Sequence, residues 1–338
     1  MKILLIKPKH IGDALLMTPL IHSIKAVYPQ SLLWVLVRKG SEGILAGCPQ
    51  IDRVLTTVAP EKKLRTKVDF LASFTLIKTL RKHRFDYIFD LSGTDRGRWI
   101  ATLSRADHRI TPHPWGRWKG LWEKIFPTPI NQSRRGHVVE QDYHLASSIL
   151  KLPQKIPPLV FDRALRTPVN LPIEGSYFVV NPTSRWKRKQ WDPPKWISLC
   201  QKLLQKVDFI VLSVGPDPEE QAFGDQITQK LDSQRVFSTK GRYAFRELAS
   251  IIASSVAFIG ADTVVMHLAA ACQTPVVAIL GPTDECHWHP WETPALLIKA
   301  RVLKGLENIP IQEVPINAIT VDYAWDKMET WLQTYSPQ

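Results

Sequence analysis

Four polar side chains near the end of the chain have the types and spacing that suit a phosphorylated sugar. Asp262 and Thr263 directly follow one apolar run, His267 lies a helical turn later, and Thr283 follows the next apolar run. In an open parallel sheet, small molecules bind outside the carboxyl ends of the strands, where backbone N–H groups at helix starts hold phosphate. We therefore expect these residues at a ligand-binding edge. The simpler interpretations are a helix N-cap for Asp262 and Thr263 and a buried structural histidine for His267.

A glycine and a carboxylate directly follow the first apolar run of the chain, in the segment Lys-Pro-Lys-His-Ile-Gly-Asp at 7–13. Gly12 permits close approach of the backbone to a ligand. Asp13 can act as a general base that takes the proton of an attacking hydroxyl, although a helix N-cap is the alternative. The segment lacks the full Gly-x-Gly-x-x-Gly pattern, so it does not indicate a dinucleotide site.

A basic segment with two hydroxyls, at 181–191, follows a later apolar run. Thr183 and Ser184 can donate hydrogen bonds to phosphate oxygens, and Lys189 can neutralise charge on a departing diphosphate. Several other cations lie beside Lys189, Arg188 among them, so the sequence leaves open which one holds the phosphate. A solvated basic loop is the plain alternative.

An acidic residue, Glu219, follows a further run that ends in a glycine turn. It can accept hydrogen bonds from ribose hydroxyls, as acidic residues do in nucleotide-binding folds. Acidic residues also favour the first turn of a helix because of the helix dipole, which is the alternative. Four strand ends with polar residues suited to a sugar nucleotide are nevertheless improbable as unrelated helix caps.

Apolar runs alternate with helical patterns along the whole chain, which predicts an α/β protein with doubly wound parallel sheets. A length of 338 residues favours two domains and a cleft between them. Continuous apolar runs predict buried strands at 3–6, 32–37, 87–89, 177–180, 209–214, 256–259 and 276–280. Helices are expected at 194–205, 219–231 and 245–253. We predict a first domain over 1–165, a linker, a second domain over 173–320, and a C-terminal helix within 321–338 that packs back on the first domain.

The charge balance indicates an anionic partner, because 44 lysines and arginines against 31 aspartates and glutamates give a net charge of +13. Nucleic acid is not expected, since no helix-turn-helix, zinc-finger or RNA-binding aromatic signature is present. Anionic lipid and a phosphorylated glycan suit the charge as well.

Cysteine usage and hydropathy bear on location. The 4 cysteines are scattered, which is typical of free thiols in a reducing compartment, and none has the spacing of a metal site. No apolar stretch approaches the roughly 20 residues that span a bilayer, and the first residues do not have the pattern of a signal peptide. We therefore expect a cytoplasmic protein without a bound metal.

An aromatic and basic segment in the first half is the candidate for acceptor or membrane contact. Trp115, Trp118 and Trp122 share one face of a predicted helix, and Arg96 and Arg98 precede it. Aromatic rings at a bilayer boundary, with cations at the lipid phosphates, would bring the protein to a membrane-borne acceptor. The alternative is that these rings pack against the sheet.

Taken in order, these motifs resemble the bacterial heptosyltransferases of glycosyltransferase family 9, and the resemblance covers nearly the whole chain. It rests on His-Ile-Gly-Asp at 10–13, Thr-Ser-Arg with a following Lys-x-Trp in 183–191, Gly-x-x-x-Glu at 215–219, Asp-Thr-x-x-x-His at 262–267 and Gly-Pro-Thr at 281–283. Within the family the chain looks most like the heptosyltransferase III group, judged by the segments 9–16, 136–140 and 287–291.

The resemblance implies a GT-B enzyme, with two Rossmann-like domains facing a cleft. It implies inverting, metal-independent transfer of heptose from ADP-heptose to the lipopolysaccharide inner core, without a cofactor, at the inner face of the inner membrane. Asp13 would be the catalytic base. The donor would be bound by Gly12, by Thr183, Ser184 and Lys189 at the phosphates, by Glu219 at the ribose, and by Asp262, Thr263 and His267 at the sugar and diphosphate.

Two other functions stay open on the sequence alone. One is a glycosyltransferase that uses another nucleotide sugar, which product analysis with ADP-heptose against UDP-sugars would separate. The other is a non-catalytic basic protein of the same fold that binds glycans or membranes. An Asp13→Asn substitution distinguishes the latter, because a binding protein would tolerate it.

Overall fold

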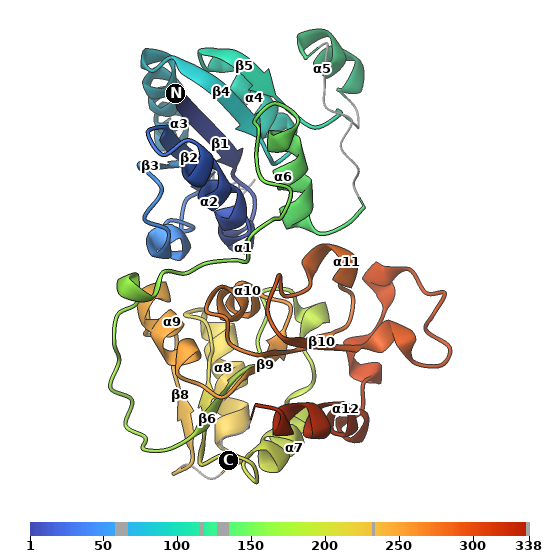
Figure 1. Ribbon diagram of the computed structural model, residues 1–338. Helices are drawn as coiled ribbons and strands as arrows, with labels where there is room; N and C mark the ends of the chain where they lie inside the picture. Colours follow the sequence, from blue (N-terminus) through green and yellow to red (C-terminus); the bar gives the residue numbers. More distant parts are fainter. Residues whose placement is uncertain (58–66, 115–117, 127–134, 232–233, 336–338) are drawn as a thin grey trace. The chain divides into compact units, whose positions relative to one another are not determined.

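The computed structural model describes residues 1–57, 67–114, 118–126, 135–231 and 234–335. The chain divides into two compact units, Met1–Pro157 and Pro158–Gln338, and each unit is built on its own sheet (Figure 1). Every strand pairing in both sheets is parallel, which confirms the prediction of two Rossmann-like α/β domains. The division after Pro157 falls a little before the boundary expected from the sequence.

The first unit has a five-stranded sheet in the order β3-β2-β1-β4-β5. Its strands are β1 (Lys2–Lys7), β2 (Leu32–Arg38), β3 (Arg53–Thr57), β4 (Phe85–Asp90) and β5 (Ala106–Ile110). The predicted runs form β1, β2 and β4, the three inner strands, because strands covered on both faces are continuously apolar. The sequence did not reveal β3 and β5, since these edge strands carry partly exposed polar residues.

The helices of the first unit are α1 (Ile11–Leu15), α2 (Thr18–Val27), α3 (Lys67–Lys82), α4 (Asp95–Leu103), α5 (Lys119–Ile125) and α6 (Val138–Ser147), with a 3-10 turn at Gly43–Gly47. One core cluster joins β1 and β4 to α3, α4 and α5 through Leu80, Ile100 and Trp122. Helix α6 contacts α2. The register pairs Ile6 with Asp90, so the ends of β1 and β4 lie at the same sheet edge.

The second unit has a six-stranded sheet in the order β11-β10-β9-β6-β7-β8. Its strands are β6 (Tyr177–Asn181), β7 (Phe209–Leu212), β8 (Val236–Ser238), β9 (Phe258–Ala261), β10 (Val276–Leu280) and β11 (Ala295–Lys299). The four runs predicted from the sequence form β6, β7, β9 and β10. Strands β6, β9 and β10 are buried along their whole length and occupy the middle of the sheet.

The helices of the second unit are α7 (Pro193–Leu203), α8 (Pro218–Thr228), α9 (Phe245–Ala253), α10 (Val264–Ala271), α11 (Glu285–Trp288) and α12 (Val321–Gln333), with short 3-10 turns at Arg163–Leu165, Lys187–Lys189, Ala300–Val302, Ile311–Glu313 and Ile316–Ala318. The three helices predicted from periodicity are α7, α8 and α9. Helix α10 follows β9 after only two residues, Asp262 and Thr263, so its start lies at the carboxyl edge of the sheet.

The C-terminal helix α12 belongs to the second unit, which corrects the prediction that it packs on the first. Ala324, Met328 and Leu332, spaced four residues apart, are buried in the core that α7 and the second sheet share. Helix α12 contacts α7 and β11. The hydrogen bond from Trp191 Nε1 to the Ile319 carbonyl, 2.9 Å long, holds the chain just before the helix. An apolar stripe identifies the buried face of a helix but not the surface that covers it.

Truncation of the buried face of α12 should therefore destabilise the second unit. We expect Leu332→Ala to lower the free energy of unfolding by about 2–5 kcal/mol, because Leu332 is 1% exposed and the substitution leaves a cavity. Thr330→Ala, on the exposed side of the same helix, should change it by less than about 0.5 kcal/mol. Urea denaturation followed by circular dichroism measures both, and equal effects would contradict this packing.

Candidate active site

Three side chains meet at Asp262, one residue beyond β9, and they come from the segments after β6 and β10 and from α10. Lys189, from the turn after β6, forms an ion pair with Asp262 Oδ2, and the side chains are 15% and 8% exposed. Thr283 Oγ1, after β10, donates a hydrogen bond to the same oxygen at 3.1 Å. His267 Nε2, from α10, lies 3.8 Å from Asp262 Oδ1. The structure thus brings together Lys189, Asp262, His267 and Thr283 as the sequence predicted, and we call this group the Asp262 cluster.

A second polar contact joins the ends of β6, β7 and β9. Thr263 Oγ1 donates to Asn181 Oδ1 at 2.9 Å, and Asn181 Nδ2 donates to the Ser213 carbonyl at 2.7 Å. Gly260 lies against this point, because a Cβ on it would be 2.8 Å from the Asn181 carbonyl oxygen. Sequence reasoning assigned no role to Asn181. The available signal was an amide at the end of a fully buried strand.

The hydroxyls of the basic segment are buried rather than displayed on its surface. Thr183 Oγ1 donates to Glu220 Oε2 at 2.9 Å, and the Gly215 N–H donates to the same oxygen at 3.0 Å. Ser184 Oγ accepts a hydrogen bond from the Trp186 N–H at 3.3 Å. Glu220, which the sequence analysis did not single out, therefore ties the start of α8 to the loop after β6.

Glu219 lies apart from the buried hydroxyls. Its carboxylate pairs with Lys187 at 2.9 Å, and both side chains are about three-quarters exposed, at 74% and 78%. The structure therefore does not bring Glu219 together with Thr183. Its position at the first turn of α8, with Asp217 as the N-cap, agrees with the helix-dipole interpretation and leaves its carboxylate open to solvent.

The cations of the basic segment differ in where they point. Only Lys189, of the described residues 185–189, forms an ion pair with Asp262. The Arg188 guanidinium is exposed and lies over the Trp186 ring, 4.8 Å from its centroid. Lys189 is thus held at the carboxyl edge of the sheet, whereas Arg188 faces the surface.

Asp13 is buried at the start of the first unit's α1. The residue is 3% exposed, and its Oδ2 accepts a hydrogen bond from the His10 N–H at 3.1 Å. Gly12 precedes it on the same helix and is partly buried. Asp13 is therefore not the N-cap of α1, which is His10; it is the third residue of the helix and accepts the N-cap N–H in a capping box. This contact leaves the second carboxylate oxygen available, because a carboxylate has more than one acceptor site.

A buried ion pair lies at the same edge of the first sheet. Lys7, the last residue of β1, pairs with Asp142 of α6, and the side chains are 5% and 4% exposed. Burial raises the pKa of Asp142 to about 6; the Lys7 ammonium opposes this shift, and the negative charges of Asp13 and Asp90 add to it. The sequence analysis missed Asp142, because only the fold brings α6 to the end of β1.

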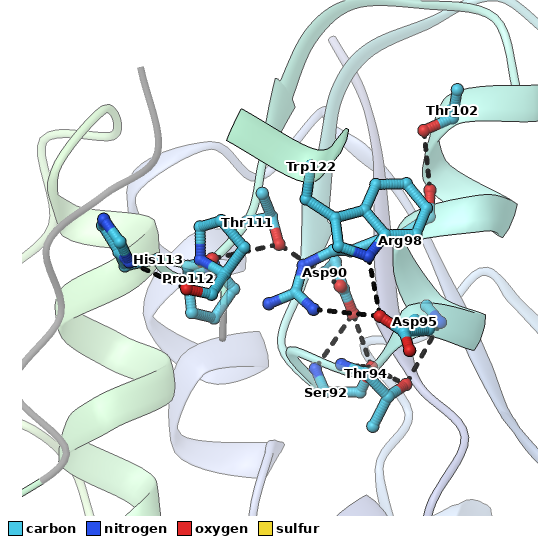
Figure 2. A network of polar contacts seen from close by, with 12 residues as sticks. Asp90, Ser92, Thr94, Asp95, Arg98, Thr102, Thr111, Pro112, His113 and Trp122 are labelled. Atoms are coloured by element: carbon cyan, nitrogen blue, oxygen red, sulfur yellow. Dashed lines mark hydrogen bonds and ion pairs between the residues drawn. The ribbon is translucent and has the colours of Figure 1, made fainter. Parts of the chain in front are cut away.

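Asp90, at the end of β4, centres a polar network that Figure 2 shows. Its Oδ1 accepts hydrogen bonds from Ser92 Oγ at 2.6 Å and from the Ser92 N–H at 3.1 Å. Burial raises the pKa of Asp90 to about 6, against the lowering effects of Ser92, Arg98 and Thr111. A side chain at position 97 would collide with the Asp90 carboxylate, so Gly97 allows α4 to approach it.

Arg98 and Trp122 are interior residues, which corrects their predicted contact with the acceptor or a membrane. Arg98 is 1% exposed, and its Nη1 lies 3.7 Å from Asp95 Oδ1. Trp122 is fully buried, and its Nε1 donates to the same Asp95 oxygen at 2.7 Å (Figure 2). Trp122 therefore fills the core beneath α5, as the packing alternative held.

The other three residues of that prediction have different outcomes. Trp118, just before α5, is 50% exposed. Arg96 on α4 is partly buried. Trp115 lies outside the described residues. Of the three tryptophans in that prediction, the structure thus describes one as exposed and one as buried.

Within the described ranges, no group of three or more histidine, cysteine, aspartate or glutamate side chains is arranged to hold a metal ion. In the same part of the chain, no helix combines the length and the apolar character needed to cross a bilayer.

Comparison with known proteins identifies the family. Residues 73–304 match glycosyltransferase family 9 (heptosyltransferase). The chain is 30% identical over 286 residues to a lipopolysaccharide heptosyltransferase 3 of Escherichia coli, an alignment that covers 83% of each protein. It is 23% identical over 326 residues to lipopolysaccharide heptosyltransferase 2 of Salmonella typhimurium, covering 90% of this chain and 88% of the relative. The resemblance to the heptosyltransferase III group is confirmed.

Solved structures share the fold along nearly the whole chain. The E. coli heptosyltransferase WaaC with ADP superposes with a TM-score of 0.81 at 18% identity, over 98% of this chain and 99% of that one. A family 9 glycosyl transferase from Veillonella parvula has a TM-score of 0.79 at 14% identity, over 98% and 97%. The chain therefore belongs to glycosyltransferase family 9 and is a glycosyltransferase with the GT-B fold.

Proposed function

We propose that the protein transfers heptose from ADP-heptose to the inner core of lipopolysaccharide, with inversion and without a metal. The Asp262 cluster carries the proposal, because it places a cation, a carboxylate and a hydroxyl at the carboxyl edge of the nucleotide-type sheet. Relatives support the choice of substrates: the E. coli relative is named a lipopolysaccharide heptosyltransferase, and WaaC structures were solved with ADP and with ADP-2-deoxy-2-fluoro heptose.

In the donor complex, the phosphate oxygens compete with Asp262 for the Lys189 ammonium. Lys189 then neutralises the diphosphate, and Asp262 becomes free to accept hydrogen bonds from sugar hydroxyls. His267 keeps the Asp262 carboxylate oriented from the other side. The other donor contacts are assigned from the positions of the residues. Thr183, Ser184 and Thr263 would contact the phosphates, and Glu219 would contact the ribose. Gly12 would allow the backbone to approach the donor closely.

The reaction is a single displacement at the anomeric carbon. The acceptor hydroxyl oxygen forms the new bond to this carbon while the bond to the β-phosphate oxygen breaks, so the configuration inverts. Asp13 accepts the proton that the hydroxyl loses. ADP leaves with its developing negative charge stabilised by Lys189. No redox cofactor is required, because no electrons leave the substrates.

The acceptor implies a membrane surface, and we place the protein in the cytoplasm at the inner leaflet of the inner membrane. The first unit exposes apolar side chains on α4 and α5, namely Trp99, Leu103, Trp118 and Leu121, each 38–50% exposed. Trp99 packs against Trp122 with ring centroids 4.9 Å apart, so the two helices adjoin. Lys119 and Lys124 are exposed beside them on α5. Apolar rings flanked by lysines suit anionic lipid.

The transfer reaction tests the proposed function. With ADP-heptose and truncated core acceptors, we expect ADP release and a product heavier by one heptose. Asp13→Asn should lower the rate by about 10²–10⁴-fold, because the general base is lost, while the Kd for ADP measured by calorimetry stays within about twofold.

Two further variants test the donor site in the same assay. Lys189→Met should weaken ADP binding by about tenfold or more, because a charge-assisted contact is removed, whereas the neighbouring Arg188→Met should change it little. Product formation only with a UDP-sugar would establish a different glycosyltransferase. No product with any donor, or full activity of Asp13→Asn, would refute the mechanism.

Vesicle binding tests the membrane surface. Trp118→Ser combined with Leu121→Ser should weaken binding to vesicles containing phosphatidylglycerol by roughly tenfold, since two apolar side chains no longer insert. The matched control is Trp186→Ser, which removes a tryptophan of similar exposure, 45%, from the second unit. Equal binding of the double variant and the wild type in a flotation assay would exclude this surface.

A further inference from the structure

The charged side chains that are fully buried in the described part of the chain all lie in the first unit. They are Lys7, Asp13, Asp90, Arg98 and Asp142, each at most 4% exposed. Lys7 and Asp90 end the neighbouring strands β1 and β4, so the group surrounds one edge of the sheet. Three carboxylates therefore share two cations in a setting where an unpaired charge is costly.

The two cations are directed at particular carboxylates. Lys7 pairs with Asp142 on α6. Arg98 pairs with the partly exposed Asp95, and its positive charge also opposes the rise that burial causes in the pKa of Asp90. Asp13 accepts the His10 N–H, and no cation of the described residues lies within 4.0 Å of its carboxylate. Lys7 therefore pairs with Asp142 and not with Asp13, the carboxylate proposed as the base.

Asp13 and Asp142 nevertheless act on one another electrostatically. The negative charge of Asp13 contributes to the raised pKa of Asp142. Lys7 contacts Asp142 directly and precedes Asp13 by six residues in the turn from β1 to α1. Lys9 is closer to Asp13 in the sequence but is exposed, so the Lys7 ammonium is the nearest buried cation along the chain that could be drawn to Asp13. An adjacent ammonium would favour the ionised form of Asp13 and weaken it as a base.

We propose that Asp142 is a positioning residue for glycosyl transfer: by holding the Lys7 ammonium at α6, it keeps that cation off Asp13 and leaves the Asp13 carboxylate as the proton acceptor. This inference rests on the proposed role of Asp13. Asp142 itself touches no substrate and acts through Lys7.

Other titratable groups belong to the elements around this edge. His10 precedes α1, His137 is the buried N-cap of α6, and the Glu140 carboxylate accepts the His137 N–H at 2.7 Å. Asp90 and Arg98 lie on β4 and α4. Asp142→Asn removes the negative charge of Asp142 as well as the partner of Lys7, so a comparison with a variant that also lacks Lys7 is needed to isolate the effect of the Lys7 charge.

The test is a direct titration of Asp13 in the full chain. Carboxyl-labelled aspartate followed by carbon NMR gives the pKa of Asp13, with its resonance assigned by its loss in Asp13→Asn. In Asp142→Asn the freed Lys7 should lower the pKa of Asp13 by about one unit, as a nearby opposite charge does. The acidic limb of the kcat profile should move to lower pH by the same amount, with a lower plateau.

Three variants serve as controls. Asp142→Glu keeps the charge and should restore the wild-type pKa of Asp13. Lys7→Met combined with Asp142→Asn removes the cation and should also return the pKa to the wild-type value. Asp52→Asn breaks another ion pair of the same unit, that between Lys25 and Asp52 at 2.7 Å, and should leave Asp13 unchanged.

Each other outcome overturns the proposal. An unchanged pKa of Asp13 in a folded Asp142→Asn would show that Lys7 does not reach Asp13. Failure of Asp142→Asn to fold, while the double variant folds, would assign Asp142 to stability alone. The titration needs no donor, so it is separate from the proposed function: an active Asp13→Asn refutes the base, whereas an inactive Asp13→Asn with no shift in Asp142→Asn refutes only the positioning role.

Discussion

The ion pair between Lys189 and Asp262 is the interaction on which the proposed donor site depends. Neither residue belongs to a strand: Asp262 directly follows β9, and Lys189 lies in the 3-10 turn of the segment after β6. They meet because β6 and β9 are paired in parallel, which brings the loops after both strands to one edge of the sheet. Thr283 joins them because β10 pairs with β9 in the same direction. The chemistry of the site is therefore a consequence of strand order, and the ion pair keeps a lysine ready for an anion.

The first unit uses charge in another way. The ionic residues at the end of its β1 and β4 are buried, and two of these carboxylates, Asp90 and Asp142, have pKa values raised to about 6 because burial outweighs the neighbouring cations. In the second unit the ion pair between Lys189 and Asp262 is partly open, with Lys189 15% exposed. At the edge of the second sheet, a bound anion could therefore take Lys189 from Asp262. At the edge of the first sheet, the fold fixes the buried charges around Asp13.

Local patterns predicted most of the architecture and the strand-end residues. Inner strands such as β1 and β10 are continuously apolar, and Asp262, His267 and Thr283 follow from their places after such runs. The patterns failed where the answer depended on distant partners. Edge strands β3 and β5 lack an apolar run. The apolar face of α12 shows that the helix is buried on one side but not which unit it packs against. Trp122 was undecided between core and surface, because a ring on a helix face suits both.

Gly260 shows how narrow the tolerance of the donor site is. A methyl group at this position would lie too close to the backbone carbonyl oxygen of Asn181. The side chain of Asn181 accepts a hydrogen bond from the Thr263 hydroxyl. Position 260 contacts none of the residues that we place at the reacting carbon. A side chain there would nevertheless push β6 and β9 apart, and Thr183 and Asp262 follow these two strands. The geometry of the proposed donor site thus depends on the absence of a side chain at position 260, behind the residues that would contact the ligand.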